Sequence, residues 1–245
     1  DEKNDPINIS LDEFHEYADG DTVELTGTVL VEPGKLGSQI LYIGNPGVQI
    51  YFYKKEWPEL ARGDHIQVHG VVRVHNELSK LHINEGANIS VLETGREIPS
   101  IGVVEKLEDE MIHSLMTIEG TALDRSTGTI TMANSEQDFL VVLKSGTNIT
   151  SKEFIEGKNY KITGILTKND DLYEVMPRDM QDIEITSADE SGVEEEKEHE
   201  TVLTTDQTSG INRKLLISFF IFGISAGIII LVVKKTSIMT HLKRL

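Results

Sequence analysis

The stretch GDHIQVHG at residues 63–70 returns as GKNYKITG at residues 157–164. Two further pairs occur in the same order along the chain: VELTG at residues 23–27 with MTIEG at 116–120, and NISV at 88–91 with DIEI at 182–185. An ordered repeat of about 93 residues predicts two homologous domains, residues 1–95 and 96–186.

Apolar and polar residues alternate inside each copy. In the first copy the alternation runs through residues 23–31 around Gly27 and through residues 66–74 around Gly70. This period of two predicts half-buried strands. A glycine at the centre of two separate strands is expected where a strand bends or bulges, and this favours a small closed barrel.

The same pattern predicts five strands in each copy. In the first they fall at residues 22–31, 38–43, 47–53, 64–74 and 80–84, and in the second at 114–124, 128–133, 138–143, 159–168 and 172–176. Between the third and fourth strands we expect a short helical piece. In the first copy it would end at Gly63; in the second it would span residues 151–155, with Ser151 as its cap and Gly157 as its stop.

Five strands with a helical insertion, in under a hundred residues, resemble the OB-fold, a five-stranded Greek-key barrel. Residues 63–70 are similar to the entry into the fourth strand of many such domains. Residues 172–183 are similar to the closing segment of OB-like modules in secreted or membrane-anchored bacterial proteins, nucleases among them. The resemblance implies an all-β fold of two tandem OB-like barrels. It implies the fold more firmly than an activity, because fold does not determine function.

The charge of the chain is acidic and unevenly distributed. The 245 residues include 41 acidic and 23 basic side chains, for a net charge of −18, of which residues 1–186 carry −17. A protein that binds by neutralising many phosphates is disfavoured by this balance. There is no cysteine, which excludes a disulfide scaffold and a thiolate metal site.

A transmembrane helix is predicted near the C-terminus. Residues 215–233, LLISFFIFGISAGIIILVV, contain no charged side chain and no proline, and as a helix they would be about 28 Å long, close to the hydrocarbon thickness of a bilayer. We expect the helix at residues 213–235 and a short basic cytoplasmic tail at 236–245. Four Lys and Arg residues follow the span and two precede it, which predicts a single-pass protein with its N-terminal domains outside the cell membrane. A chain that starts at Asp1 fits a product whose secretory signal was removed.

Two further features accompany this helix. Residues 187–212 contain eight acidic residues, one lysine and no aromatic residue, which predicts a disordered acidic linker. Gly223 and Gly227 form a GxxxG pair that could support a weak homodimer in the membrane. The alternative is an ordinary lipid-facing helix.

A candidate ligand-binding face lies on the first barrel, because OB-folds generally bind ligands on strands two and three and the adjoining loops. Pairing across the turn at residues 44–47 predicts one exposed face that carries aromatic and amide side chains flanked by cations. Its members are Tyr42, Gln49, Tyr51, Tyr53, Lys35, Lys54, Lys55 and Arg73. Such a face suits the stacking of bases or sugars. The alternative is that the tyrosines cover the sheet and pack on the second barrel.

Histidines are concentrated in the first barrel, at positions 65, 69, 75 and 82. Along a strand His65 and His69 would be about 13 Å apart, so they could not bind one metal ion. Acid sensing by these side chains is left as an alternative. There is no GxSxG, HExxH or P-loop motif, and we expect no enzyme activity, metal or cofactor.

The sequence therefore predicts a membrane-anchored, extracytoplasmic binding or assembly module. Its expected partners are the lipid bilayer, through residues 215–233, and single-stranded nucleic acid, through the first barrel. The alternative is an acidic scaffold that binds protein or glycan partners at the cell surface and no nucleic acid.

Overall fold

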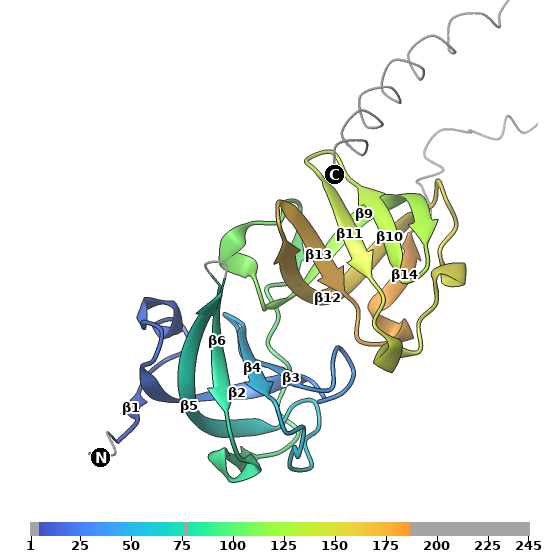
Figure 1. Cartoon of the computed structure of the whole chain (residues 1–245). Helices are drawn as coiled ribbons and strands as arrows, with labels where there is room; N and C mark the ends of the chain where they lie inside the picture. Colours follow the sequence, from blue (N-terminus) through green and yellow to red (C-terminus); the bar gives the residue numbers. More distant parts are fainter. Residues whose placement is uncertain (1–4, 76–77, 187–245) are drawn as a thin grey trace, which may run out of the picture. The chain divides into compact units, whose positions relative to one another are not determined.

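The computed structural model describes residues 5–75 and 78–186 (Figure 1). These residues form two seven-stranded sheets and six short 3-10 helices, with no α-helix among them. In this part of the chain, no helix is long and apolar enough to cross a membrane. The acidic linker, the transmembrane helix, the Gly223–Gly227 pair and the basic tail were predicted at residues 187–245 and lie outside the described residues.

Strands β2–β6 close the first barrel. Their bounds are β2 (Thr22–Val31), β3 (Ile40–Ile43), β4 (Val48–Phe52), β5 (His65–His75) and β6 (Leu78–Ile83). Their order is β2-β3-β4-β6-β5, and β5 pairs back onto β2. The β4–β6 pair is parallel, and the other neighbours are antiparallel.

Strands β9–β13 repeat this arrangement in the second barrel. Their bounds are β9 (Leu115–Ser126), β10 (Thr129–Ala133), β11 (Asp138–Val142), β12 (Asn159–Asn169) and β13 (Leu172–Met176). The order is β9-β10-β11-β13-β12, β12 closes onto β9, and β11 and β13 run parallel. Both barrels therefore have the OB-like topology, and the prediction of two tandem five-stranded barrels is confirmed.

The repeat extends to two short strands at the margins of each barrel. They are β1 (Ile7–Asn8) and β7 (Ile89–Glu93) in the first sheet, and β8 (Val103–Val104) and β14 (Ile183–Thr186) in the second. β1 and β8 pair in parallel with the first barrel strand, and β7 and β14 pair with the fourth. A 3-10 helix directly precedes each of β7 and β14.

Glycines inside the strands allow neighbouring strands to approach closely. A Cβ atom on Gly70 would lie 2.5 Å from the carbonyl oxygen of His82, and one on Gly164 would lie 2.7 Å from that of Met176. Both glycines are on the fourth strand of their barrel and face the fifth, where a side chain would not fit. The register shifts occur elsewhere, between Val29 and Val31, at Thr131/Met132, and at His65/Ile66 in the pairing with β7.

The predicted helical pieces are only partly present. Residues 54–63 contain no helix, because Pro58 restricts the preceding residue to extended backbone and the Trp57 ring packs at 87° against Phe52. In the second barrel a 3-10 helix spans Ser151–Glu153, and its N-cap is Thr150 rather than Ser151. The helix ends earlier than predicted, because its C-cap is Phe154 in extended backbone rather than Gly157. Gly157 has a positive φ of 80° but lies in a separate turn, in which the Lys158 N–H donates to the Ile155 carbonyl.

Apolar side chains from both barrels form a third core between the two barrel interiors. Its fully or nearly fully buried members are Leu30, Val31, Leu36 and Tyr42 of the first barrel, and Leu115, Ile165 and Met176 of the second. A buried hydrogen bond supports this contact: the Gly47 N–H donates to Ser114 Oγ at 2.8 Å. The barrels therefore share one apolar interface within a single compact unit.

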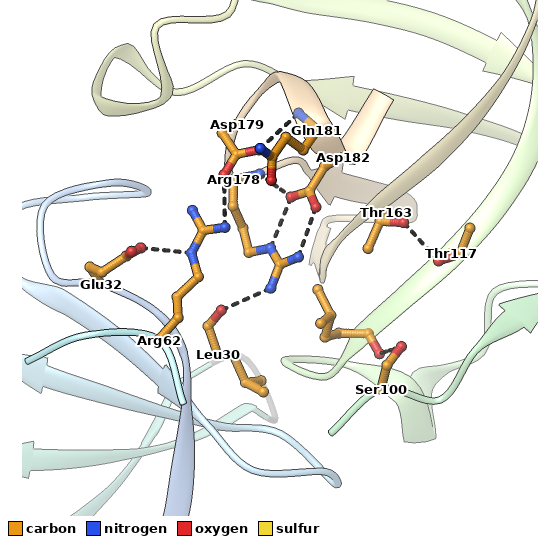
Figure 2. Close-up of polar contacts among 11 residues, drawn as sticks. Leu30, Glu32, Arg62, Ser100, Thr117, Thr163, Arg178, Asp179, Gln181 and Asp182 are labelled. Atoms are coloured by element: carbon orange, nitrogen blue, oxygen red, sulfur yellow. Dashed lines mark hydrogen bonds and ion pairs between the residues drawn. The ribbon is translucent and has the colours of Figure 1, made fainter. Parts of the chain in front are cut away.

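Two arginines hold the barrels together beside this core (Figure 2). Arg178 of the second barrel forms a bidentate ion pair with Asp182, at 2.8 and 2.7 Å, and its Nη1 donates to the Leu30 carbonyl of β2 at 3.1 Å. Arg62 of the first barrel pairs with Glu32 and reaches Asp179 of the second at 2.7 Å. Arg178 and Asp182 are both buried.

Candidate nucleic-acid interface

The prediction of an exposed face is wrong for two of its residues. Tyr42 and Gln49 are opposite each other on β3 and β4, as the turn pairing predicts, but both are buried. Tyr42 belongs to the core between the barrels, and its ring lies 5.8 Å from that of His113. Burial raises the pKa of Tyr42. The second barrel thus covers this end of the face, which was the alternative interpretation.

Tyr51 lies half-buried in the middle of the face. It pairs in register with His82 of β6, and the two rings lie 4.8 Å apart at 34°. Burial, together with Arg73 and Lys80, lowers the pKa of His82, so this imidazole is neutral at pH 7. Arg73 is exposed and pairs with Asp19 at 3.4 Å. This part of the face offers an aromatic surface beside two cations, Lys80 and the Asp19-paired Arg73.

Tyr53 is the aromatic residue that remains exposed, with 75% of its surface accessible. It follows β4 directly, and its carbonyl accepts a hydrogen bond from Gln39 Nε2 at 3.1 Å. Lys54 and Lys55 come next and are both exposed. Lys55 has a positive φ of 62°, so the chain turns sharply at this point.

Trp57 completes the group. It is partly buried against the first core, and its indole N–H donates to the Ser38 carbonyl at 2.9 Å. Ser38 lies in the loop that joins β2 to β3. The same loop carries Lys35, which is half-buried. We call Tyr53, Lys54, Lys55, Trp57 and Lys35 the loop surface. Neither its three lysines nor any other residue in it forms an ion pair with a described residue.

The loop surface brings together four of the predicted site residues and one that was not predicted. Trp57 is the single tryptophan of the chain, and its place two residues after the Lys54-Lys55 pair was a usable signal. Aromatic rings beside unpaired cations are the groups that bind single-stranded nucleic acids, through base stacking and phosphate contacts. No catalytic chemistry is required of these side chains.

His113 is a buried histidine at the junction between the barrels, next to Tyr42. Its side chain is 2% exposed, its Nδ1 has no hydrogen-bond partner among the described residues, and its φ is 70°. Burial, with smaller contributions from Lys80 and His15, lowers its pKa to about 3. An ordinary histidine in the unfolded chain titrates near pH 6.5, so between these values the unfolded chain binds the additional proton.

Stability is therefore expected to be constant above pH 6.5 and to fall as the pH decreases. From pH 6.5 to 5 His113 should cost about 2 kcal/mol, since each pH unit is worth about 1.4 kcal/mol. Urea unfolding at both pH values, for the wild type and for His113→Asn, which tolerates a positive φ, measures this contribution. His15, His65 and His82 also have lowered pKa values and contribute in both proteins. Equal losses in the two proteins would show that His113 is not responsible.

Comparisons with known proteins assign the chain to no family. No protein-family model matches the chain, and no curated protein matches it. Among solved structures, a murine DNA binding protein bound with double-stranded DNA is 11% identical, with 67% of this chain and 99% of that chain covered and a TM-score of 0.32. The tetrameric p202 HIN2 is 13% identical, with coverages of 70% and 98% and a TM-score of 0.31. The single-stranded DNA binding protein from Thermus aquaticus is 14% identical, with coverages of 72% and 98% and a TM-score of 0.27. Similarity at this level assigns no function to the chain.

Proposed function

We propose that this chain is a membrane-anchored protein that binds single-stranded nucleic acid on the loop surface of its first barrel. The observation that carries the proposal is the placement of exposed Tyr53 with Lys54, Lys55 and Trp57 directly after β4. Hydrogen bonds from Trp57 to the Ser38 carbonyl and from Gln39 to the Tyr53 carbonyl join this segment to the loop between the first two barrel strands, which carries Lys35. Ligands of OB barrels generally bind on the second and third strands and on the loop between the first two, and this surface adjoins both. The protein acts by binding, and no enzyme activity is part of the proposal.

The chain presents this surface at a membrane. Residues 215–233 cross the bilayer, and the barrels lie outside the cell with the C-terminus in the cytoplasm, as the charges flanking the span favour. Protease added to intact cells would then digest the barrels and spare the tail. If the barrels survive protease in intact cells but are digested in lysed cells, they lie on the cytoplasmic side of the membrane.

The role of Tyr53 gives the proposal a specific test. Tyr53→Ala should weaken the binding of a single-stranded oligonucleotide to the full chain in detergent by roughly 5- to 150-fold, the equivalent of one lost base stack of about 1–3 kcal/mol. Because Tyr53 is mostly exposed, the free energy of unfolding should stay within about 0.5 kcal/mol of the wild type. Leu172→Ala, an exposed apolar residue of the second barrel, is the matched control. Equal binding by the wild type and Tyr53→Ala would show that nucleic acid does not bind on the loop surface.

The net charge of −17 over residues 1–186 favours a second function, an acidic scaffold for protein or glycan partners. This charge repels a phosphate backbone at long range. The two functions respond differently to salt, because binding through phosphates weakens as salt rises, whereas an apolar or glycan contact does not. A partner that is retained at high salt while oligonucleotides do not bind would support the scaffold.

A further inference from the structure

A hollow of about 330 Å³ lies between one loop of each barrel. Residues 34–38, from the loop between β2 and β3, line one side, and residues 144–146, which follow β11, line the other. Its volume is at the lower end of the range for small-ligand sites. It accommodates a group the size of a phosphate with part of a sugar, and not a large ligand.

The two loops are held against each other by close packing. A Cβ atom on Gly146 would overlap the carbonyl oxygen of Gly34, so the second loop can come this near only because residue 146 is glycine. On the first loop, Leu36 is buried in the core between the barrels. On the second, buried Thr147 donates from Oγ1 to the Lys144 carbonyl at 2.7 Å. The walls of the hollow are therefore preformed.

The lining of this hollow is positively charged in an otherwise acidic protein. Lys35 and Lys144 both line it, no acidic side chain does, and neither lysine forms an ion pair with a described residue. Ser38 and Ser145 add one hydroxyl from each loop. Two lysines with hydroxyls and glycine-rich backbone are groups that bind phosphate oxygens.

We propose that this hollow binds a phosphate group, which Lys35 of the first barrel and Lys144 of the second hold from opposite sides. The inference rests on the proposed function, because Ser38 accepts the Trp57 hydrogen bond and so joins the hollow to the loop surface. A single-stranded nucleic acid with a base stacked on Tyr53 would place one of its backbone phosphates in the hollow and would contact both barrels. A free phosphate compound is the other source of the same group.

Two lysine variants and one control test the site in the full chain in detergent. Lys35→Ala and Lys144→Ala should each weaken binding of a labelled dT oligonucleotide about threefold at 0.1 M salt, and each should lower the slope of log affinity against log salt by about 0.7. Lys158→Ala removes an exposed lysine of the second barrel that does not line the hollow and should change neither quantity. Unchanged thermal unfolding of each variant confirms that it folds.

Inorganic pyrophosphate tests the site independently of nucleic acid. Trp57 is the single tryptophan and bonds to a residue of the lining, so its emission reports on the hollow. Pyrophosphate should change this emission saturably in the wild type and in Lys158→Ala, and not in the Lys35→Ala/Lys144→Ala variant.

The outcomes separate the two proposals. Oligonucleotide binding that depends on Tyr53 but is equal in the wild type and Lys144→Ala overturns the phosphate site and leaves the proposed function standing. A wild type that binds no oligonucleotide but binds pyrophosphate through both lysines supports the site with a free phosphate ligand, and it overturns the proposed function. The absence of both responses overturns both.

Discussion

Replacing Arg178 with alanine is expected to lower the free energy of unfolding by about 3–5 kcal/mol, the usual cost of removing one partner of a buried ion pair. The variant leaves the Asp182 carboxylate, 6% exposed, without its cation, and leaves the Leu30 carbonyl of the first barrel without the Arg178 Nη1 donor. Because the guanidinium joins β2 to the second barrel, the loss should affect the packing of both.

Arg62 provides the matched control. Arg62 also joins the barrels, through Glu32 and Asp179, but its ion pairs are partly exposed to solvent. Pairs of this kind contribute about 0–1 kcal/mol. Urea unfolding of the full chain in detergent should therefore show a much larger loss for Arg178→Ala than for Arg62→Ala. Equal losses would mean that the buried pair does not hold the barrels together.

Tyr42→Ala should have a comparable effect, for a different reason. The Tyr42 ring is 2% exposed in the core between the barrels, and truncation of a buried aromatic ring costs about 3–5 kcal/mol through lost burial and the cavity that remains. The same change at Tyr53, which is exposed, should leave stability almost unaltered while oligonucleotide binding falls.

The two tyrosine variants thus separate packing from binding. Thermal unfolding and oligonucleotide titration of both proteins, at a temperature where Tyr42→Ala is still folded, give the comparison. If Tyr42→Ala is as stable as the wild type and loses binding, the ring is a ligand contact and does not stabilise a core between the barrels.

The barrels could be predicted from the sequence because their strands have strong local signals. Alternation around Gly27 and Gly70, repeated in the second copy, indicates where strands occur and which residues face inward. The bounds of β2, Thr22–Val31, coincide with the predicted residues. The turn at residues 44–47 likewise predicts the pairing of Tyr42 with Gln49, which the structure has.

Exposure could not be predicted in the same way. Strand periodicity shows that Tyr42 points away from its own barrel core, but whether water or another domain lies there depends on contacts between residues far apart in the sequence. Leu115 and Met176, which pack in the same core as Tyr42, belong to the other barrel. The contribution of Lys144 to the hollow has the same origin, because it depends on how the second barrel meets the loop that carries Lys35.

Titration of the full chain in detergent with a labelled single-stranded oligonucleotide, at 50 mM and at 200 mM salt, tests the central claim most directly. If Lys35, Lys54 and Lys55 contact phosphates, binding should be saturable at 50 mM and about twentyfold weaker at 200 mM, since each contact to a single strand contributes about 0.7 to the slope. No saturable binding at 50 mM, or an affinity that does not change with salt, would contradict nucleic-acid binding through this surface.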